Sequence, residues 1–198
     1  MKSLAIVILA AGASARMGIP KQLLPFQNDT LLGTVLKNAT HTKIETIYCV
    51  VGANASEVKK THQHYKVTFI TNPNHATGLS SSIQKAVSFI SENHLGIEAI
   101  LFLLGDQPFI TSEYIQNYID LHLKHPRNII ATSYANNVGV PALFPKHYFG
   151  NLQTMTGDQG AKHLLNGTET KKLISLPSEA LIDIDTLETY ESIIRSLQ

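Results

Sequence analysis

Two cations lie within a stretch of small residues near the start of the chain. Residues 9–22 read LAAGASARMGIPKQ, in which Arg16 and Lys21 carry the positive charges. A loop without bulky side chains exposes its backbone N–H groups, and such groups can bind a polyphosphate together with an Arg and a Lys. Lys supplies a compact charge, whereas the planar guanidinium of Arg pairs with phosphate oxygens. The alternative is an ordinary strand-to-helix turn that carries two solvated cations.

The loop matches neither of two common nucleotide-binding patterns. Gly12 and Gly18 are too far apart for the G-x-G-x-x-G of dinucleotide folds. Lys21 does not directly follow Gly18, as the P-loop pattern G-x-x-x-x-G-K-[ST] requires. No H-E-x-x-H, C-x-x-C or G-x-S-x-G pattern occurs either. The sequence therefore does not indicate a nicotinamide cofactor, a P-loop ATPase, a zinc site or a serine hydrolase.

Carboxylates at two other places are candidates for holding a metal ion. Asp106 lies in the sequence GDQP, just after the apolar run 99–104, and Asp183 and Asp185 alternate near the C-terminus. Mg²⁺ prefers one or two carboxylates together with phosphate oxygens and water. Asp183 and Asp185 share one face if their segment is extended. The structural alternatives are a turn aspartate before proline for Asp106 and a helix cap for Asp185.

The glycine-rich loop resembles the signature of nucleotidyltransferases that move a nucleoside monophosphate from an NTP to a phosphate-bearing acceptor. The pattern LAAGxSxRMGxxK, with Pro20 before Lys21 and Gln22 after it, is typical of that superfamily. Segments along the whole chain are similar, in the same order, to those of molybdenum cofactor cytidylyltransferases. These are the loop 9–22, the segment 72–82, GDQP, the two stretches 139–144 and 156–162, and DIDTLE near the end.

The resemblance implies a Mg²⁺-dependent enzyme that transfers CMP from CTP to a molybdopterin-type cofactor and releases pyrophosphate. It implies catalytic roles for Lys21, Arg16 and Asp106, and binding of Mg²⁺ by Asp106 and Asp185 in preference to Asp183. It also implies a molybdoenzyme or a cofactor chaperone as protein partner. The residues that it assigns to the nucleotide are Leu9, Ala10, Ala11, Gly12, Ala13, Ser14, Arg16, Lys21, Gly78, Ser80 and Ser81.

The sequence departs from the family pattern at positions expected to face the acceptor and the base. His75 stands where an aromatic residue is common, Val140 replaces a histidine, and Lys162 replaces an arginine. The sequence LAAG is typical of the cytidylyl branch, since the guanylyl branch tends to have a second glycine. Two other functions stay open: nucleotidyl transfer to a sugar or alcohol phosphate, and nucleotide or cofactor binding without turnover.

Apolar runs alternate with amphipathic segments, which predicts an α/β fold. We expect strands at 4–10, 46–51, 67–70, 99–104, 129–131, 142–144 and 172–176. We expect helices at 30–40, 55–62, 80–91, 112–123, 159–165 and 187–197, and a turn at 136–139. This alternation implies a mostly parallel sheet covered on both faces, a single-domain Rossmann-like three-layer sandwich over residues 1–198, similar to nucleotide-diphospho-sugar transferases. Ligands bind beyond the carboxyl ends of such strands, so the loop 9–22 and Asp106 should share one edge.

Composition and charge fit a globular enzyme of 198 residues with a formal net charge of +1. A near-neutral chain presents no basic face for nucleic acid or membrane. The single cysteine, Cys49, lies in an apolar run, which excludes a disulfide framework and fits a reducing cytosol. The apolar start superficially resembles a signal peptide, but it is short and leads into the cationic loop. We therefore expect a cytoplasmic protein.

Overall fold

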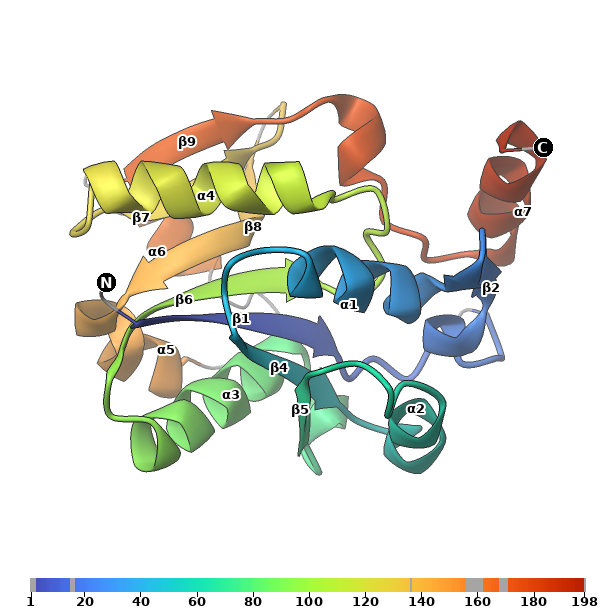
Figure 1. The fold of residues 1–198 in the computed structure, drawn as a ribbon, viewed down its shortest axis with the longest axis horizontal. Helices are drawn as coiled ribbons and strands as arrows, with labels where there is room; N and C mark the ends of the chain where they lie inside the picture. Colours follow the sequence, from blue (N-terminus) through green and yellow to red (C-terminus); the bar gives the residue numbers. More distant parts are fainter. Residues whose placement is uncertain (1–2, 15–16, 136, 156–161, 168–170, 198) are drawn as a thin grey trace.

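A seven-stranded sheet forms the centre of the computed structural model, which describes residues 3–14, 17–135, 137–155, 162–167 and 171–197 (Figure 1). The strands lie in the order β5-β4-β1-β6-β8-β7-β9. Strand β8 is antiparallel to both of its neighbours, and the other neighbouring pairs are parallel. The strands are β1 (Ser3–Ala10), β4 (Thr46–Val51), β5 (Thr68–Thr71), β6 (Ile97–Leu104), β7 (Ile129–Ser133), β8 (Val138–Pro145) and β9 (Lys171–Ser175).

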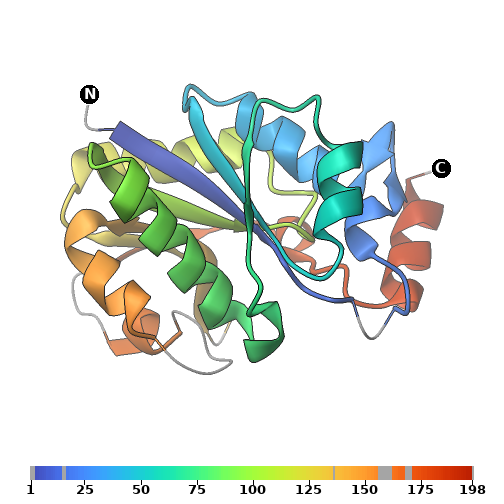
Figure 2. The ribbon, with the colours of Figure 1, turned by 90° about the horizontal axis from the view of Figure 1, so that it is seen from below.

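Helices cover both faces of the sheet, which confirms the predicted three-layer α/β fold (Figure 2). One face packs against α1 (Leu31–Thr40), α2 (Ala55–Thr61) and α4 (Ser112–Lys124). The other packs against α3 (Leu79–Asn93), α5 (Phe149–Gln153) and α6 (Lys162–Gly167). No helix of the described ranges is both long and apolar enough to span a membrane.

The central strands explain why the sheet is stable. Strands β1 and β6 are almost continuous runs of Val, Ile, Leu and Ala, as expected for strands buried on both faces. Their register pairs Leu9 with Leu104, so both strands end at the same edge. Cys49 is fully buried and reduced in β4, and burial raises the pKa of its thiol. This cysteine therefore acts as a small core residue.

The last helix, α7 (Leu187–Ser196), packs against a small hairpin of β2 (Pro25–Phe26) and β3 (Asp29–Thr30) (Figure 1). Ile184 is wholly buried in the cluster that joins them. Thr186, and not Asp185, caps α7, because its hydroxyl accepts a hydrogen bond from the Thr189 N–H at 3.2 Å. The capping alternative for Asp185 is therefore wrong. Short 3-10 helices cover Lys21–Leu23, His75–Thr77, Lys146–Tyr148 and Ser178–Leu181.

The region around β8 differs most from the prediction. The expected turn at 136–139 lies earlier, because Tyr134 and Asn137 are joined by backbone hydrogen bonds and β8 begins at Val138. The piece expected at 142–144 is an eight-residue strand. The glycine and proline within it break the apolar pattern that would have revealed its length. Of the helix expected at 159–165, residues 159–161 lie outside the described part of the chain.

A buried histidine joins α1 to α2. His62 is fully buried, and its Nδ1 lies 2.8 Å from the Val58 carbonyl oxygen. A carbonyl only accepts, so Nδ1 carries the proton and Nε2 accepts from the Thr30 hydroxyl at 2.7 Å. Thr30 in turn caps α1 by accepting from the Gly33 N–H at 2.9 Å. Burial favours the neutral imidazole and lowers the pKa of His62, despite the hydrogen bond to the Val58 carbonyl and the nearby Asp29 carboxylate.

We expect His62 to make the protein less stable in acid. The unfolded chain takes up a proton near the ordinary pKa of 6.5, whereas the folded chain resists it until a lower pH. The free energy of unfolding should therefore fall as pH drops below that value, by up to about 1.4 kcal/mol per pH unit. Urea unfolding at about pH 7.5 and about pH 5.5 measures this fall. His62→Gln should weaken the pH dependence, and His41→Gln at an exposed position should not. Equal pH dependence in wild type and His62→Gln would contradict the prediction.

Candidate active site

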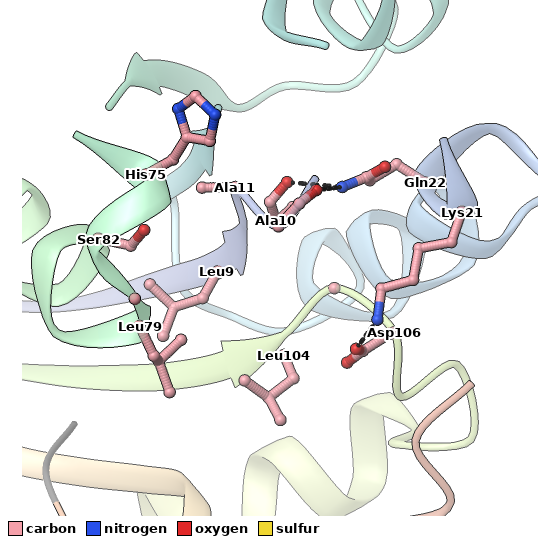
Figure 3. Close-up of a pocket in the computed structure, with 13 residues that line it drawn as sticks. Leu9, Ala10, Ala11, Lys21, Gln22, His75, Leu79, Ser82, Leu104 and Asp106 are labelled. Atoms are coloured by element: carbon pink, nitrogen blue, oxygen red, sulfur yellow. Dashed lines mark hydrogen bonds and ion pairs between the residues drawn. The ribbon is translucent and has the colours of Figure 1, made fainter. Parts of the chain in front are cut away.

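The loop after β1 and the loop after β6 meet at one edge of the sheet. The chain runs from β1 to β4 on one side, whereas β6 lies on the other side of β1. The space beyond β1 and β6 is therefore a topological switch point, where α/β sheets bind ligands. Figure 3 shows Lys21 of the first loop pointing at Asp106 of the second. The predicted meeting of these two loops is thus present in the fold.

Lys21 joins two carboxylates that are far apart in the sequence. Its Nζ lies 2.5 Å from Oδ2 of Asp106 and 2.7 Å from Oδ1 of Asp185. The side chains of Lys21 and Asp106 are only 14% and 19% exposed. Burial opposes the charge of Lys21, but attraction to Asp106 and Asp185 outweighs it and raises the pKa of the ammonium group. Lys21 therefore stays positively charged at neutral pH.

Gln22 fixes the shape of the glycine-rich loop. Its side-chain amide is buried and donates to the carbonyl oxygens of Ala10 at 3.0 Å and Gly12 at 2.8 Å. The Lys21 N–H donates to the Ser14 hydroxyl at 3.1 Å, and Ser14 has a positive φ of 53°. The loop thus folds back so that Lys21 returns over the end of β1. The sequence PKQ pointed to this residue, but no role was assigned to it.

A cavity of about 240 Å³ opens above the loop (Figure 3). It brings together six of the residues predicted for the nucleotide, with Asp106 beside them. Ala13, Ser14, Ser80 and Ser81 do not line it, and Ser82 does. Arg16 lies outside the described residues. The lining residues are Leu9, Ala10, Ala11, Gly12, Lys21, Gln22, His75, Gly78, Leu79, Ser82, Leu104, Gly105 and Asp106.

The serines that open α3 have different surroundings. Ser81 donates to the carbonyl oxygens of Asn74 at 2.9 Å and Gly78 at 2.8 Å, which ties the helix start to the preceding loop. Asn72 donates to the hydroxyl oxygens of Ser81 at 2.9 Å and Ser82 at 3.0 Å. Ser82 therefore faces the cavity from a fixed position. The sequence predicted a group of serines near the ligand but could not tell which of them points inward.

Two glycines allow the walls of the cavity to approach each other. A Cβ on Gly52, at the end of β4, would lie 2.3 Å from the Ala11 carbonyl oxygen and 2.8 Å from Cβ of His75. A Cβ on Gly105 would lie 2.9 Å from Cβ of Ala10. Gly105 thus permits contact between the ends of β1 and β6, in addition to lining the cavity. Gly52 was missed because its neighbours are distant in the sequence.

Asp183 is a third carboxylate close to Asp106 and Asp185. It accepts from the side-chain amide of Gln107 at 2.8 Å. The Ile184 N–H donates to the Asp106 carbonyl oxygen at 3.1 Å and so fixes the segment between Asp183 and Asp185. Partial burial of its carboxyl group and the negative charge of Asp106 raise the pKa of Asp183. The two C-terminal aspartates therefore have separate partners: Gln107 for Asp183 and Lys21 for Asp185.

The carboxylates fit a metal ion that arrives with a nucleotide. Among the described residues, no three His, Cys, Asp or Glu side chains gather closely enough to hold a metal by themselves. Asp106 and Asp185 nevertheless converge on one cationic group, the Lys21 ammonium. Oδ1 of Asp106 is buried and has no hydrogen-bond partner within the described ranges, so it can accept a cation. Two carboxylates are enough for Mg²⁺ when phosphate oxygens and water complete its coordination.

A second cavity, of about 300 Å³, adjoins the first through Leu79 and Leu104, which line both. Its wall includes Tyr134 and the β8 residues Val138, Gly139 and Val140. Gly139 and Val140, from a segment predicted to face an acceptor, therefore line a space next to the first cavity. Of the other segment expected there, 156–162, residues 156–161 lie outside the described part of the chain.

Comparisons with known proteins give one consistent result. The model of the MobA-like NTP transferase domain family matches residues 6–173. Purine catabolism protein PucB of Bacillus subtilis is 26% identical over 96% of this chain and 96% of its own length. The molybdenum cofactor cytidylyltransferase of Escherichia coli is 34% identical over 56% of this chain and 55% of its own length.

Two solved structures are similar to this chain over almost its whole length. A homologue of Mycobacterium tuberculosis Rv0371c from Mycobacterium sp. strain JC1 superposes with a TM-score of 0.84 and 31% identity, covering 98% of this chain and 96% of that one. Rv0371c of M. tuberculosis, solved as a complex with manganese, has a TM-score of 0.77 and 26% identity over 98% of this chain and 99% of its own.

Proposed function

We propose, on the premise that this chain belongs to the family of MobA-like NTP transferase domains, that it transfers CMP from CTP to a molybdopterin-type acceptor with the help of Mg²⁺. The chain is a nucleotidyltransferase of the cytidylyltransferase type. The observation that carries the proposal is the position of Lys21, between Asp106 and Asp185 at the edge of the cavity above the glycine-rich loop. Lys21 and Asp106 line the same cavity, and Asp185 contacts Lys21.

The reaction that fits this site is a displacement at the α-phosphorus of the nucleotide. An oxygen of the acceptor's terminal phosphate forms a bond to the α-phosphorus. The bond from that phosphorus to the oxygen bridging the α- and β-phosphates breaks, and pyrophosphate leaves. The attacking oxygen is already anionic, so no general base is required. The protein must align the two reactants and offset their negative charges.

Different residues of the chain are proposed to align the reactants and to offset their charges. The backbone N–H groups of the loop 11–14, together with Arg16, are proposed to hold the β- and γ-phosphates. Lys21 keeps its charge and is proposed to stabilise the charge that grows on the α-phosphate. Asp106 and Asp185 are proposed to hold Mg²⁺, which neutralises phosphate oxygens when bound. The manganese complex of Rv0371c supports divalent metal use among similar proteins.

The remaining proposals concern the nucleotide base and the acceptor. Cytidine is supported by the sequence LAAG and by the match to the E. coli cytidylyltransferase. Gly78 and Ser82 line the proposed nucleotide cavity at the start of α3, where a base edge can be bound. Ser80 and Ser81 do not line the cavity and would support the start of the helix. A molybdoenzyme or a chaperone of its cofactor would receive the product.

Pyrophosphate release tests the proposal. Purified protein with Mg²⁺ is supplied with CTP or GTP and with molybdopterin, a sugar phosphate or an alcohol phosphate. We expect release with CTP and molybdopterin, and much slower release with GTP. If pyrophosphate is released with a sugar or alcohol phosphate and not with molybdopterin, the acceptor is that phosphate and the proposed acceptor is wrong. NTP binding without release for any acceptor would indicate a binding protein that does not catalyse transfer.

A further inference from the structure

Gln107 is a fully buried side chain that the reaction described above does not use. Its Nε2 donates to Oδ1 of Asp183 at 2.8 Å and to the Tyr134 hydroxyl oxygen at 3.3 Å. An ionised carboxylate only accepts hydrogen bonds, so the amide nitrogen must face Asp183, and both amide protons are then used. Its Oε1 is buried without a partner in the described part of the chain. This orientation leaves the buried oxygen unpaired, which lowers the stability of the fold. A specific task for the amide would explain why this cost is tolerated.

Tyr134 extends this chain of hydrogen bonds to the second cavity. Its hydroxyl donates to the Val140 carbonyl oxygen at 2.5 Å and accepts from Gln107. Burial raises the pKa of Tyr134, so the phenol keeps the proton that it donates. Tyr134 and Val140 both line the second cavity. The hydrogen bonds therefore lead from the wall of that cavity, through one buried amide, to a carboxylate beside Asp106.

Backbone contacts connect the segments at the two ends of this series of hydrogen bonds. Gln107 directly follows Asp106, and Ile184 directly follows Asp183, while the Ile184 N–H is bonded to the Asp106 carbonyl oxygen. The backbone bond holds the two segments together, so a shift of the Gln107 amide would reorient the Asp183 carboxyl group beside Asp106. Val140 lies in β8, which is paired with β6. A molecule that displaces the Tyr134 ring would thus act on the same buried amide.

We propose that Gln107 and Tyr134 are positioning residues that fix the Asp183 carboxylate relative to the molecule held in the second cavity. The proposal rests on the proposed function, in which that molecule is the phosphorylated acceptor. Gln107 holds the carboxylate, and Tyr134 sets the orientation of the amide from the acceptor side. The two residues act as one unit, because the same Nε2 of Gln107 donates to the Tyr134 hydroxyl and to Asp183.

The test is a double-mutant cycle on the full chain with Gln107→Leu, Tyr134→Phe and the double variant. We expect Gln107→Leu to lower kcat about 10-fold to 100-fold, with the KM for CTP almost unchanged. Tyr134→Phe should lower kcat several-fold, and the double variant should match Gln107→Leu, because the phenol acts only through the amide. The control is Tyr118→Phe, which removes the buried hydroxyl that bonds Thr132 at 2.6 Å. Its kcat should stay within about twofold of wild type.

A second measurement does not depend on turnover. Asp183 lies next in the chain to Ile184, whose N–H is bonded to the carbonyl oxygen of the proposed ligand Asp106. The affinity of Mn²⁺ in the presence of CTP, followed by electron paramagnetic resonance, should therefore fall about 10-fold in Gln107→Leu and stay unchanged in Tyr118→Phe. If wild type binds Mn²⁺ and CTP but transfers to no acceptor, the proposed function fails and this measurement alone decides the role of Gln107. Multiplicative losses in the double variant, or wild-type kcat and Mn²⁺ affinity in Gln107→Leu, would overturn the proposal.

Discussion

Replacing Lys21 with Met should lower kcat roughly 100-fold to 1,000-fold. The ammonium lies between Asp106 and Asp185, where negative charge from two carboxylates and a triphosphate would meet. Met has a similar length and no charge, so the transition state would lose the cation proposed to act at the α-phosphate while the loop keeps its packing. Steady-state pyrophosphate release with CTP measures the loss. Lys21→Arg should recover only part of the rate, because a guanidinium is larger and directs its charge differently.

A matched control separates this effect from the general loss of a lysine ion pair. Lys146 pairs with Glu98 at 3.1 Å, and the two side chains are 48% and 40% exposed. Such a surface pair contributes little to stability, so Lys146→Met should keep wild-type kcat. If Lys21→Met retained a kcat close to that of wild type, the proposed role of Lys21 at the α-phosphate would be wrong.

Asp106→Asn should have an effect of similar size, with a different signature. Asn has the same shape as Asp, so the loop after β6 should remain in place, but the amide cannot offer two anionic oxygens to a metal. We expect kcat to fall about 100-fold or more, and the Mg²⁺ concentration needed for half-maximal rate to rise. Titration of Mg²⁺ at saturating CTP measures both quantities.

Asp120 provides the control for this substitution. It is exposed on α4 and accepts from Gln116 at 2.7 Å. Asp120→Asn should change neither kcat nor the Mg²⁺ requirement. An Asp106→Asn protein with an unchanged Mg²⁺ requirement would show that Asp106 is not a metal ligand, whatever its rate.

The sequence predicts elements well where the signal is local. The apolar run of β1 and the periodic apolar residues of α1 mark these elements within one or two residues of their observed ends. The loop 9–22 and Asp106 were predicted at one edge because parallel strands end together, and the structure brings Lys21 and Asp106 into contact there. This part of the site follows from strand order alone.

The rest of the site depends on contacts that no local pattern reveals. Gly52 meets Ala11 only after β4 pairs with β1, and Gln107 meets Asp183 only after the C-terminal segment returns to β6. The choice of Ser82 over Ser80 and Ser81 depends on the rotation of α3 against the cavity. These features are set by tertiary packing, which sequence periodicity does not specify.

The contacts of Lys21 also determine when the site can form. The partners of this lysine lie 85 and 164 positions later in the chain. Closing such long loops carries an entropic cost, so the local pairings of β1, α1 and β4 should precede these contacts during folding. Detachment of α7 together with Ile184, which is buried in the segment before it, would release Asp185 while the central strands stay paired. The site would then be lost before the sheet melts, and hydrogen exchange should show α7 opening with less free energy than β1.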